Sequence, residues 1–392
     1  MKEIGNHFQS ELEEIKAQGL YRSLYPFQVN NGKHLNLNGK AYLNFSSNNY
    51  LDLADDEHLK QGAIQAIQEW GAGGKASRLI HGSTSLHELL ESTIAKFKQT
   101  EAALLFNSGY HANVGVLSQL AAEGDVYFTD ELNHASIIDG LRLSKAKKVI
   151  YPHLDLNYLE AQLKQERLKN AKGKLIIVTE SVFSMDGDVA PLLDLLSLAE
   201  KYDVWIYLDE AHAVGVFGKT GQGLVEACGI LKERLQRVIQ MGTFGKAFGS
   251  FGAFIAGSKN LIEWLINRVR TFIYTTSLPP AVLGATLAAL RMMPEEQVRR
   301  DRLWHNLRTL EKLLQTRWDK TFKIVSPIVP LRLNDLAKTL RASEFLKSAG
   351  FWLTAIRYPT VAPGTERLRL TVMSSHTDEE LAQLVSTLEQ VL

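Results

Sequence analysis

The expected fold of this chain follows from the stretch Val204–His212, which reads VWIYLDEAH. Its first five residues form an apolar run with little polar alternation, as in a strand that is covered on both faces. Similar runs occur at Ala102–Phe106, Val126–Thr129, Leu175–Thr179, Val238–Met241 and Ala253–Ala256. Helical patterns lie between several of these runs, for example at Leu156–Leu163 and Leu192–Ala199. The alternation predicts an α/β domain with a mainly parallel sheet.

The pattern changes close to Pro294, where a second region begins. A long helical stretch from Glu295 to about Leu314 leads into a strand-like run, a helix, a further strand and a last helix. These later elements are expected at Phe322–Val329, at Ala342–Ser348, at Arg367–Met373 and after the capping-box spacing Thr377-x-x-Glu380. The same spacing, Ser85-x-x-Glu88, precedes a helix of the first region. We therefore expect an N-terminal segment at residues 1–50, a large domain at 51–290 and a smaller α+β domain at 291–392.

The composition excludes several classes of protein. A net charge of +1 supplies no basic field for nucleic acid. No run reaches the roughly eighteen apolar residues that a membrane helix needs, and the polar N-terminus lacks the apolar core of a signal peptide. The single cysteine, Cys228, rules out an internal disulfide and a thiolate metal cage. We expect a cytoplasmic protein that binds neither nucleic acid nor a membrane.

Two short motifs match nucleotide-binding signatures but lack the context that those signatures need. Gly71–Ala76 fits a loose dinucleotide fingerprint, yet helical spacing instead of a strand precedes it, so we interpret it as a flexible loop. Asp209–His212 spells the acidic box of a helicase family, but no complete phosphate loop lies upstream. No further His or carboxylate has metal-ligand spacing to Asp209 and His212, and no metal is expected.

Three polar residues follow two of the predicted strands. Asp209 ends the strand at Val204–Leu208, His212 comes three residues later, and Lys246 lies in a Gly- and Phe-rich loop after Val238–Met241. Ligands of open parallel sheets bind beyond the carboxyl ends of the strands, so these side chains could converge. A partly desolvated lysine can form an imine, and a rigid carboxylate can keep a pyridinium nitrogen protonated. The turn Asn107–Tyr110 opens a helix whose first amides suit a phosphate.

Longer motifs share this order along the chain. They are Leu43–Leu51, Phe106–Asn113, Asn133–Ser136, Glu180–Asp188, Asp209–His212, Thr243–Lys246, Tyr274–Pro280 and Ala355–Val361. Together they resemble the α-oxoamine synthases, a fold-type-I family of pyridoxal-phosphate enzymes, from about Tyr21 to His376. The implied fold is a large domain with a mainly parallel sheet plus a smaller α+β C-terminal domain.

The resemblance implies a role around pyridoxal 5′-phosphate for each catalytic position. Lys246 would carry the cofactor covalently and later move the substrate Cα proton. Asp209 would pair with the pyridine nitrogen and His212 with the ring hydroxyl. His134, within Asn-His-Ala-Ser, would stack on the ring face. Taken singly, each of these residues has a simpler explanation as a loop charge, a helix cap or a buried histidine.

Further contacts follow from the same resemblance. The cofactor and its phosphate would be surrounded by Gly109, Tyr110, Ser184 and Thr243. The family forms a homodimer with a shared active site, in which Thr276 could reach the partner's phosphate. The amino-acid carboxylate would be held by Arg357 with help from Asn48, whereas Arg22 and Thr360 match positions that contact substrate. A planar, bidentate arginine suits that anion.

The expected reaction condenses an amino acid with an acyl thioester and releases carbon dioxide. The segment Ala355–Val361 is most similar to the biotin-pathway members, which use L-alanine and a pimeloyl thioester. Ser77-Arg78-Leu79 lacks the succinyl-binding Asn of the 5-aminolevulinate synthases. Glycine with acetyl-CoA, serine with a long acyl chain, and a catalytically silent partner subunit stay open as alternatives. The thiol carrier, CoA or acyl carrier protein, is not specified by the motifs.

Overall fold

The structure, a computed structural model, describes residues 4–169 and 172–391. It forms two compact units. The first, called the sheet unit here, comprises Asn48–Ser184 and Asp188–Asp301. The second, called the terminal unit, comprises the described residues up to Ser47, Met185–Gly187 and those from Arg302 onward. Residues before Ser47 therefore pack with the C-terminal region, where the sequence led us to expect a separate N-terminal segment.

The sheet unit contains one seven-stranded sheet with the order β4-β10-β9-β8-β7-β5-β6. Its strands are β4 (Ala102–Phe106), β5 (Val126–Asp130), β6 (Lys147–Tyr151), β7 (Leu175–Glu180), β8 (Trp205–Asp209), β9 (Val238–Thr243) and β10 (Ala253–Gly257). Strand β10 is antiparallel to both of its neighbours, and the other pairs are parallel. All six strands predicted in this region are confirmed. The sequence pattern missed β6, because this edge strand exposes Lys147, Lys148 and Ile150.

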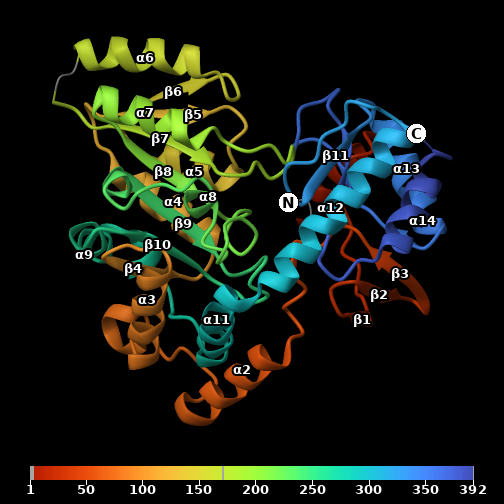
Figure 1. Cartoon of the computed structure of the whole chain (residues 1–392), viewed down its shortest axis with the longest axis horizontal. Coiled ribbons are helices and arrows are strands. Elements are labelled where there is room, and N and C mark those ends of the chain that lie inside the picture. Colours follow the sequence, from red (N-terminus) through yellow and green to blue (C-terminus); the bar gives the residue numbers. More distant parts are fainter. Residues whose placement is uncertain (1–3, 170–171, 392) are drawn as a thin grey trace. The chain divides into compact units, whose positions relative to one another are not determined.

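The sheet unit also contains helices, several of which contact the sheet, whereas α2 packs on α11 (Figure 1). They are α2 (Glu57–Trp70), α3 (Ser85–Phe97), α4 (Gly109–Leu120), α5 (Ala135–Leu143), α6 (Leu156–Lys169), α7 (Leu192–Tyr202), α8 (Leu224–Ala227), α9 (Lys259–Arg268), α10 (Arg270–Ile273) and α11 (Pro280–Met292), with the short turns η1 (Arg78–Gly82), η2 (Arg234–Arg237) and η3 (Met293–Glu295). The predicted apolar faces are buried in α6 at Leu159 and Leu163, and in α7 at Leu192, Leu195, Leu196 and Ala199. The core joins α4 and α5 to the sheet through side chains such as Val116, Ile137 and Ile176.

Two predicted features around α2 and α3 have different outcomes. Helix α2 precedes Gly71, whose φ of 81° ends the helix, so the Gly71–Ala76 segment is a turn and not part of a strand-to-helix fingerprint. The capping box predicted at Ser85 is wrong by one residue, because Thr84 is the N-cap and His87 closes the box. The box predicted at Thr377 and Glu380 is confirmed.

The terminal unit contains two small sheets and the ends of the chain. Strands β1 (Val29–Asn30), β2 (His34–Leu37), β3 (Lys40–Asn44) and β12 (Phe351–Trp352) form one sheet, and β11 (Ile328–Arg332), β14 (Arg367–Thr371) and β13 (Ala355–Ile356) form the other. Its helices are α1 (Ile4–Ala17), α13 (Leu336–Ser348) and α14 (Asp378–Leu388), together with most of α12 (Gln297–Arg317). Figure 1 shows β1–β3 in red and α13 and α14 in blue, because this unit joins segments from both ends of the sequence.

One strand of the terminal unit was predicted in the wrong place. The expected run Phe322–Val329 is a strand only from Ile328 onward, where β11 begins. Residues 322–325 do alternate in exposure, which is why the pattern resembles a strand. They have no strand partner in the described structure, since the pairing with β14 begins only at Ile328. Among the described residues, no helix is long and apolar enough to span a membrane.

Candidate active site

The carboxyl ends of several strands of the sheet unit carry the predicted cofactor residues. Asp209 is the last residue of β8 and Thr243 the last residue of β9. Gly109 follows β4, His134 follows β5 and Ser184 follows β7. Strands β5, β7, β8 and β9 are parallel neighbours, and β4 runs in the same direction because antiparallel β10 separates it from β9, so their carboxyl ends lie along one edge of the sheet. The structure therefore gathers these five predicted positions at that edge.

Asp209 is a buried carboxylate with only neutral hydrogen-bond donors. Its side chain accepts from Asn113 Nδ2 at 2.8 Å and from the Ala211 amide at 2.9 Å, and the residue is 4% exposed. Asn113 is fixed in turn because its Oδ1 accepts from the Tyr207 hydroxyl at 2.8 Å. No ion pair to Asp209 occurs among the described residues. A buried anion needs a compensating positive group, and a protonated pyridine nitrogen is such a group.

Lys246 and His212 face each other directly. The Lys246 Nζ lies 2.7 Å from the Nε2 of His212. On the other side of the imidazole, Nδ1 lies 2.7 Å from the hydroxyl of Tyr50, which donates to Asn48 Oδ1 at 3.2 Å. This arrangement favours the His212 tautomer with hydrogen on Nδ1, because Tyr50 uses its own hydrogen on Asn48. In that tautomer Nε2 is an acceptor aimed at the lysine.

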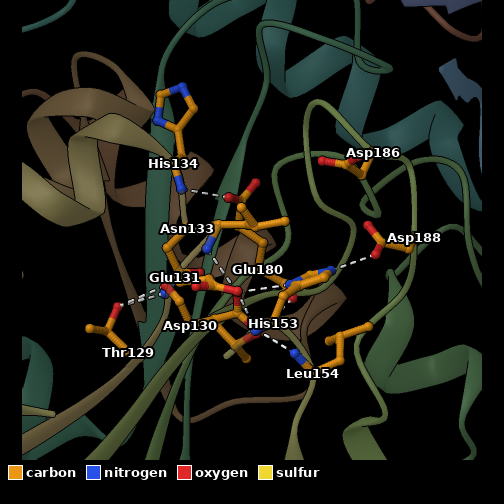
Figure 2. A network of polar contacts seen from close by, with 12 residues as sticks. Thr129, Asp130, Glu131, Asn133, His134, His153, Leu154, Glu180, Asp186 and Asp188 are labelled. Carbon is orange, nitrogen blue, oxygen red and sulfur yellow. Dashed lines mark hydrogen bonds and ion pairs between the residues drawn. The ribbon is translucent and has the colours of Figure 1, made fainter. Parts of the chain in front are cut away.

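His134 is held at its backbone and not through its ring alone. Its amide donates to Glu180 Oε1 at 2.6 Å, and Figure 2 shows the imidazole pointing away from that carboxyl group. The ring Nδ1 lies 2.8 Å from the Ser136 hydroxyl, and His134 is the N-cap of α5. Partial desolvation lowers the pKa of His134, assisted by Lys246 and opposed by Asp209 and Asp139. A neutral imidazole at a fixed backbone position can lie flat against an aromatic ring.

Glu180 was not predicted as a site residue, although it begins a quoted motif. It is the last residue of β7, is paired in register with Asp209, and is 3% exposed. Complete burial raises the pKa of Glu180 well above its usual range, and the charge of Asp209 acts in the same direction. The Glu180 carboxyl group therefore takes up a proton more easily than an exposed glutamate does.

The start of α4 forms the surroundings expected for a phosphate. Ser108 is the N-cap of the helix and accepts from the amide of His111. A Cβ at Gly109 would lie 2.8 Å from the flexible terminal methyl of Met241, so glycine leaves that methyl undisturbed. Tyr110 is exposed, and its hydroxyl donates to Asp139 at 2.5 Å. The helix dipole and its first amides favour an anion here.

The other predicted cofactor contacts differ in exposure. Ser184 is buried, at 8% exposure. The Thr243 hydroxyl donates to the Gly252 carbonyl at 2.8 Å and accepts from the Gly245 amide, so it shapes the loop that carries Lys246. Thr276 is exposed, and its carbonyl accepts from Asn107 Nδ2 at 2.9 Å.

Three predicted substrate residues lie together in the terminal unit. Arg22, Arg357 and Thr360 line one cleft of about 590 Å³. Each arginine donates to the backbone carbonyl of a residue next to the other arginine in sequence. Arg22 donates to the Tyr358 carbonyl at 3.0 Å, and Arg357 donates to the Tyr21 carbonyl at 2.6 Å. Burial and the neighbouring Arg22 charge lower the pKa of Arg357. The buried Nε of Arg357 has no partner among the described residues, as expected of a guanidinium that binds an anionic ligand.

The predicted residues of the sheet unit thus fit pyridoxal phosphate on geometric grounds. Comparisons with known proteins agree. A profile of the class I and II aminotransferases matches residues 40–388. The 8-amino-7-oxononanoate synthase of Citrifermentans bemidjiense is 45% identical over 98% of this chain and 97% of its own length, and that of Geobacter sulfurreducens is 43% identical over 97% and 96%. The chain belongs to the 8-amino-7-oxononanoate synthase family.

Solved structures confirm the α-oxoamine synthase resemblance and the fold-type-I class. Serine palmitoyltransferase from S. paucimobilis, solved with pyridoxal phosphate and myriocin, aligns with a TM-score of 0.91 at 27% identity, covering 100% of this chain and 98% of that one. The 8-amino-7-oxononanoate synthase of Francisella tularensis aligns with a TM-score of 0.75 at 30% identity, over 89% and 97%. These two solved proteins have different names for their activities but align with the same fold, so the fold alone does not determine the substrate.

Sequence reasoning missed several residues that hold the predicted ones in place. Asn113 and Tyr50 lay within quoted motifs, but nothing in their spacing connected them to Asp209 and His212. Their contacts join residues 96 and 162 positions apart. The one local signal that could have marked Asn113 is its place among the apolar residues Ala112, Val114 and Val116 of α4.

Proposed function

We propose that this chain binds pyridoxal 5′-phosphate through Lys246 and condenses L-alanine with a pimeloyl thioester. The products are 8-amino-7-oxononanoate, carbon dioxide and the free thiol. The observation that carries the proposal is the pairing of Lys246 with His212 at 2.7 Å on the same sheet edge as the buried Asp209. The family membership at 42–45% identity supports the choice of reaction.

Residues of the sheet unit would hold and tune the cofactor. Asp209 would keep the ring nitrogen protonated, because a positively charged nitrogen would compensate the charge of this buried carboxylate. Pyridoxal phosphate supplies a ring that accepts the electron pair left at the substrate Cα. Lys246 would bind the cofactor, and after release it would remove and return the Cα proton. His212 Nε2 can accept a proton from the Lys246 ammonium, which frees the amine for attack.

The substrate carboxylate would bind to Arg357, with Asn48 as a second contact. Arg357 and Arg22 bring two guanidinium groups to one cleft, and no acidic partner for either occurs among the described ion pairs. Such a site favours anions, which fits the carboxylates of alanine and of the pimeloyl chain. Arg22 and Thr360 would contact substrate from the same cleft. CoA and acyl carrier protein are both possible thiol carriers in this proposal.

The assembly and location belong to the proposal as well. We infer a cytoplasmic homodimer with a shared active site, in which Thr276 approaches the phosphate bound by the partner. The exposure of Thr276 supports this role. Mixing Lys246→Ala chains with Thr276→Glu chains should restore turnover, because one site of the mixed dimer then keeps both intact residues. Two inactive variants that stay inactive after mixing would argue for an independent site in each chain.

The function is tested by product analysis with a substrate matrix. Alanine, glycine and serine are each supplied with pimeloyl, acetyl and palmitoyl thioesters, and thiol release is followed with a chromogenic reagent. Alanine with a pimeloyl thioester should be fastest. One methyl group contributes only about 1–3 kcal/mol of discrimination, so most of the preference should come from the acyl chain. Faster turnover of glycine with acetyl-CoA would move the chain to a sister activity.

The cofactor attachment is tested independently of the substrate. Borohydride trapping followed by peptide mapping should place the pyridoxyl label on Lys246. A label on Lys219 or another lysine would overturn the assignment. A colourless protein that takes up no pyridoxal phosphate would favour the silent-subunit alternative.

A further inference from the structure

His153 lies outside every role assigned so far, yet both of its ring nitrogens contact carboxylates. It follows the edge strand β6. Its Nδ1 lies 2.8 Å from Asp130 Oδ1, and its Nε2 lies 2.5 Å from Asp188 Oδ2 (Figure 2). The ring stands edge-on to Phe183, with the two ring centres 4.5 Å apart. The contacts fix both the position and the plane of the imidazole.

The contacts require a positively charged imidazole. Only the imidazolium donates from both nitrogens, and an ionised carboxylate can only accept. Burial by itself would lower the pKa of His153, but the hydrogen bonds and charges of Asp130 and Asp188 outweigh it and raise the pKa to about 10. The third acidic group nearby, Glu131, accepts from the His153 backbone amide at 2.9 Å. His153 is therefore a cation at neutral pH.

Asp130 connects this cation to the loop that carries His134. It is the last residue of β5, and its buried carboxylate also accepts from the amides of Leu132 and Leu154. Three residues further along the chain, Asn133 donates to the Val178 carbonyl at 2.8 Å. The chain then places the His134 amide on Glu180. The position of His134 thus depends on a short loop that begins at the His153–Asp130 contact.

Asp188 connects the same cation to the segment that carries Ser184. The Asp188 carbonyl accepts from the Phe183 amide at 3.0 Å, and Val182 and Val189 form an isolated bridge. Its carboxylate depends on His153, because Oδ1 is buried without a hydrogen-bond partner among the described residues. The Asp188 side chain is 34% exposed, so loss of His153 would leave the carboxylate partly hydrated but without the contact that holds it toward Asp130. The segment that carries Ser184 would then lose its ion-pair connection to the His134 loop.

We propose that His153 is a positioning residue for the cofactor site, where it bridges Asp130 and Asp188 and so holds the His134 loop and the Ser184 segment together. The inference rests on the proposed function for the identity of the cofactor. It assigns to His153 no contact with substrate. Its effect reaches the chemistry because His134 and Ser184 must keep their places around the ring.

The test compares His153→Gln with His153→Lys in the full chain loaded with pyridoxal phosphate. Gln keeps the approximate size but loses the charge, whereas Lys keeps a cation that can donate to both carboxylates. For His153→Gln we expect kcat to fall by about 10- to 100-fold without a matching rise in KM, as for other misplaced active-site groups. The visible circular dichroism of each bound cofactor should fall too. His153→Lys should recover part of both.

Controls separate this role from a loss of stability. His87→Gln removes another buried histidine of the sheet unit, far from the bridge in sequence, and should lower the melting temperature while keeping kcat and the dichroism. If His153→Gln does not fold, Asp188→Asn cuts one arm of the bridge and should shift the same two readouts. Normal kcat and dichroism in His153→Gln, or equal loss in the Gln and Lys variants, would overturn the proposal. A wild-type protein that takes up no cofactor would instead refute the proposed function.

Discussion

Replacing Asp209 by Asn removes one negative charge from a side chain that is 4% exposed, at the point where the cofactor nitrogen is proposed to bind. Two unit charges about 4 Å apart interact by about 4 kcal/mol at an effective dielectric constant of about 20. Screening is limited because the group is buried. Each 1.36 kcal/mol corresponds to about a tenfold change in rate, so kcat should fall about a thousandfold.

The same substitution also disturbs the local hydrogen bonds. Asp209 accepts from Asn113 and from the Ala211 amide, whereas an amide group at this position can accept on one side only. One buried donor then loses its acceptor, which should lower the free energy of unfolding by about 1–3 kcal/mol. A stability loss and a rate loss are therefore expected together, and they must be separated.

A swapped variant separates the two effects. In Asp209→Asn combined with Asn113→Asp, the carboxylate and the amide exchange places, so the hydrogen bond between them is restored. Tyr207 can still donate to the group at position 113. We expect the swap to recover much of the unfolding free energy in chemical denaturation but not kcat, because the charge no longer faces the ring nitrogen. Near-normal kcat in Asp209→Asn, or recovery of kcat in the swap, would refute this reasoning.

Three further predictions concern stability and substrate binding. Lys98→Met leaves Glu210 buried and unpaired and should cost about 3–5 kcal/mol of unfolding free energy in urea denaturation, partly recovered by adding Glu210→Gln; a loss under about 1 kcal/mol would contradict this. Arg357→Ala should weaken alanine binding about 10- to 150-fold while the cofactor absorption is unchanged, and an unchanged KM would argue for another carboxylate contact. His376 is buried, and burial lowers its pKa from 6.5 to about 4. As the pH is lowered from 6.5 to 4, the unfolded chain takes up this proton before the folded chain does, so the free energy of unfolding should decrease over that range. His376→Gln should flatten that slope, and an identical slope would show that other groups dominate it.

The sequence by itself determined the strands of the large sheet and the residues at their ends. Strands buried on both faces must be apolar along their whole length, so β4, β5, β7, β8, β9 and β10 are visible as local runs. Asp209 and Lys246 could be placed because each follows such a run directly. Strand β6 escaped because an edge strand exposes one side to water and keeps its lysines there. Residues 322–325 alternate in exposure as a strand would, but no strand pairs with them. A local sequence pattern does not show whether a partner strand is present.

Only the tertiary structure decided which side chains support the predicted ones. Asn113 reaches Asp209 across 96 positions, Tyr50 reaches His212 across 162, and His153 joins Asp130 to Asp188. None of these contacts leaves a periodic signal, because a hydrogen bond depends on distance and direction in space and not on spacing along the chain. Burial acts in the same way: the pKa of Glu180 rises because the folded sheet removes water from its carboxyl group and places it beside Asp209. Residue type supplies the chemistry that is possible, whereas the surrounding fold sets the charge and orientation with which it acts.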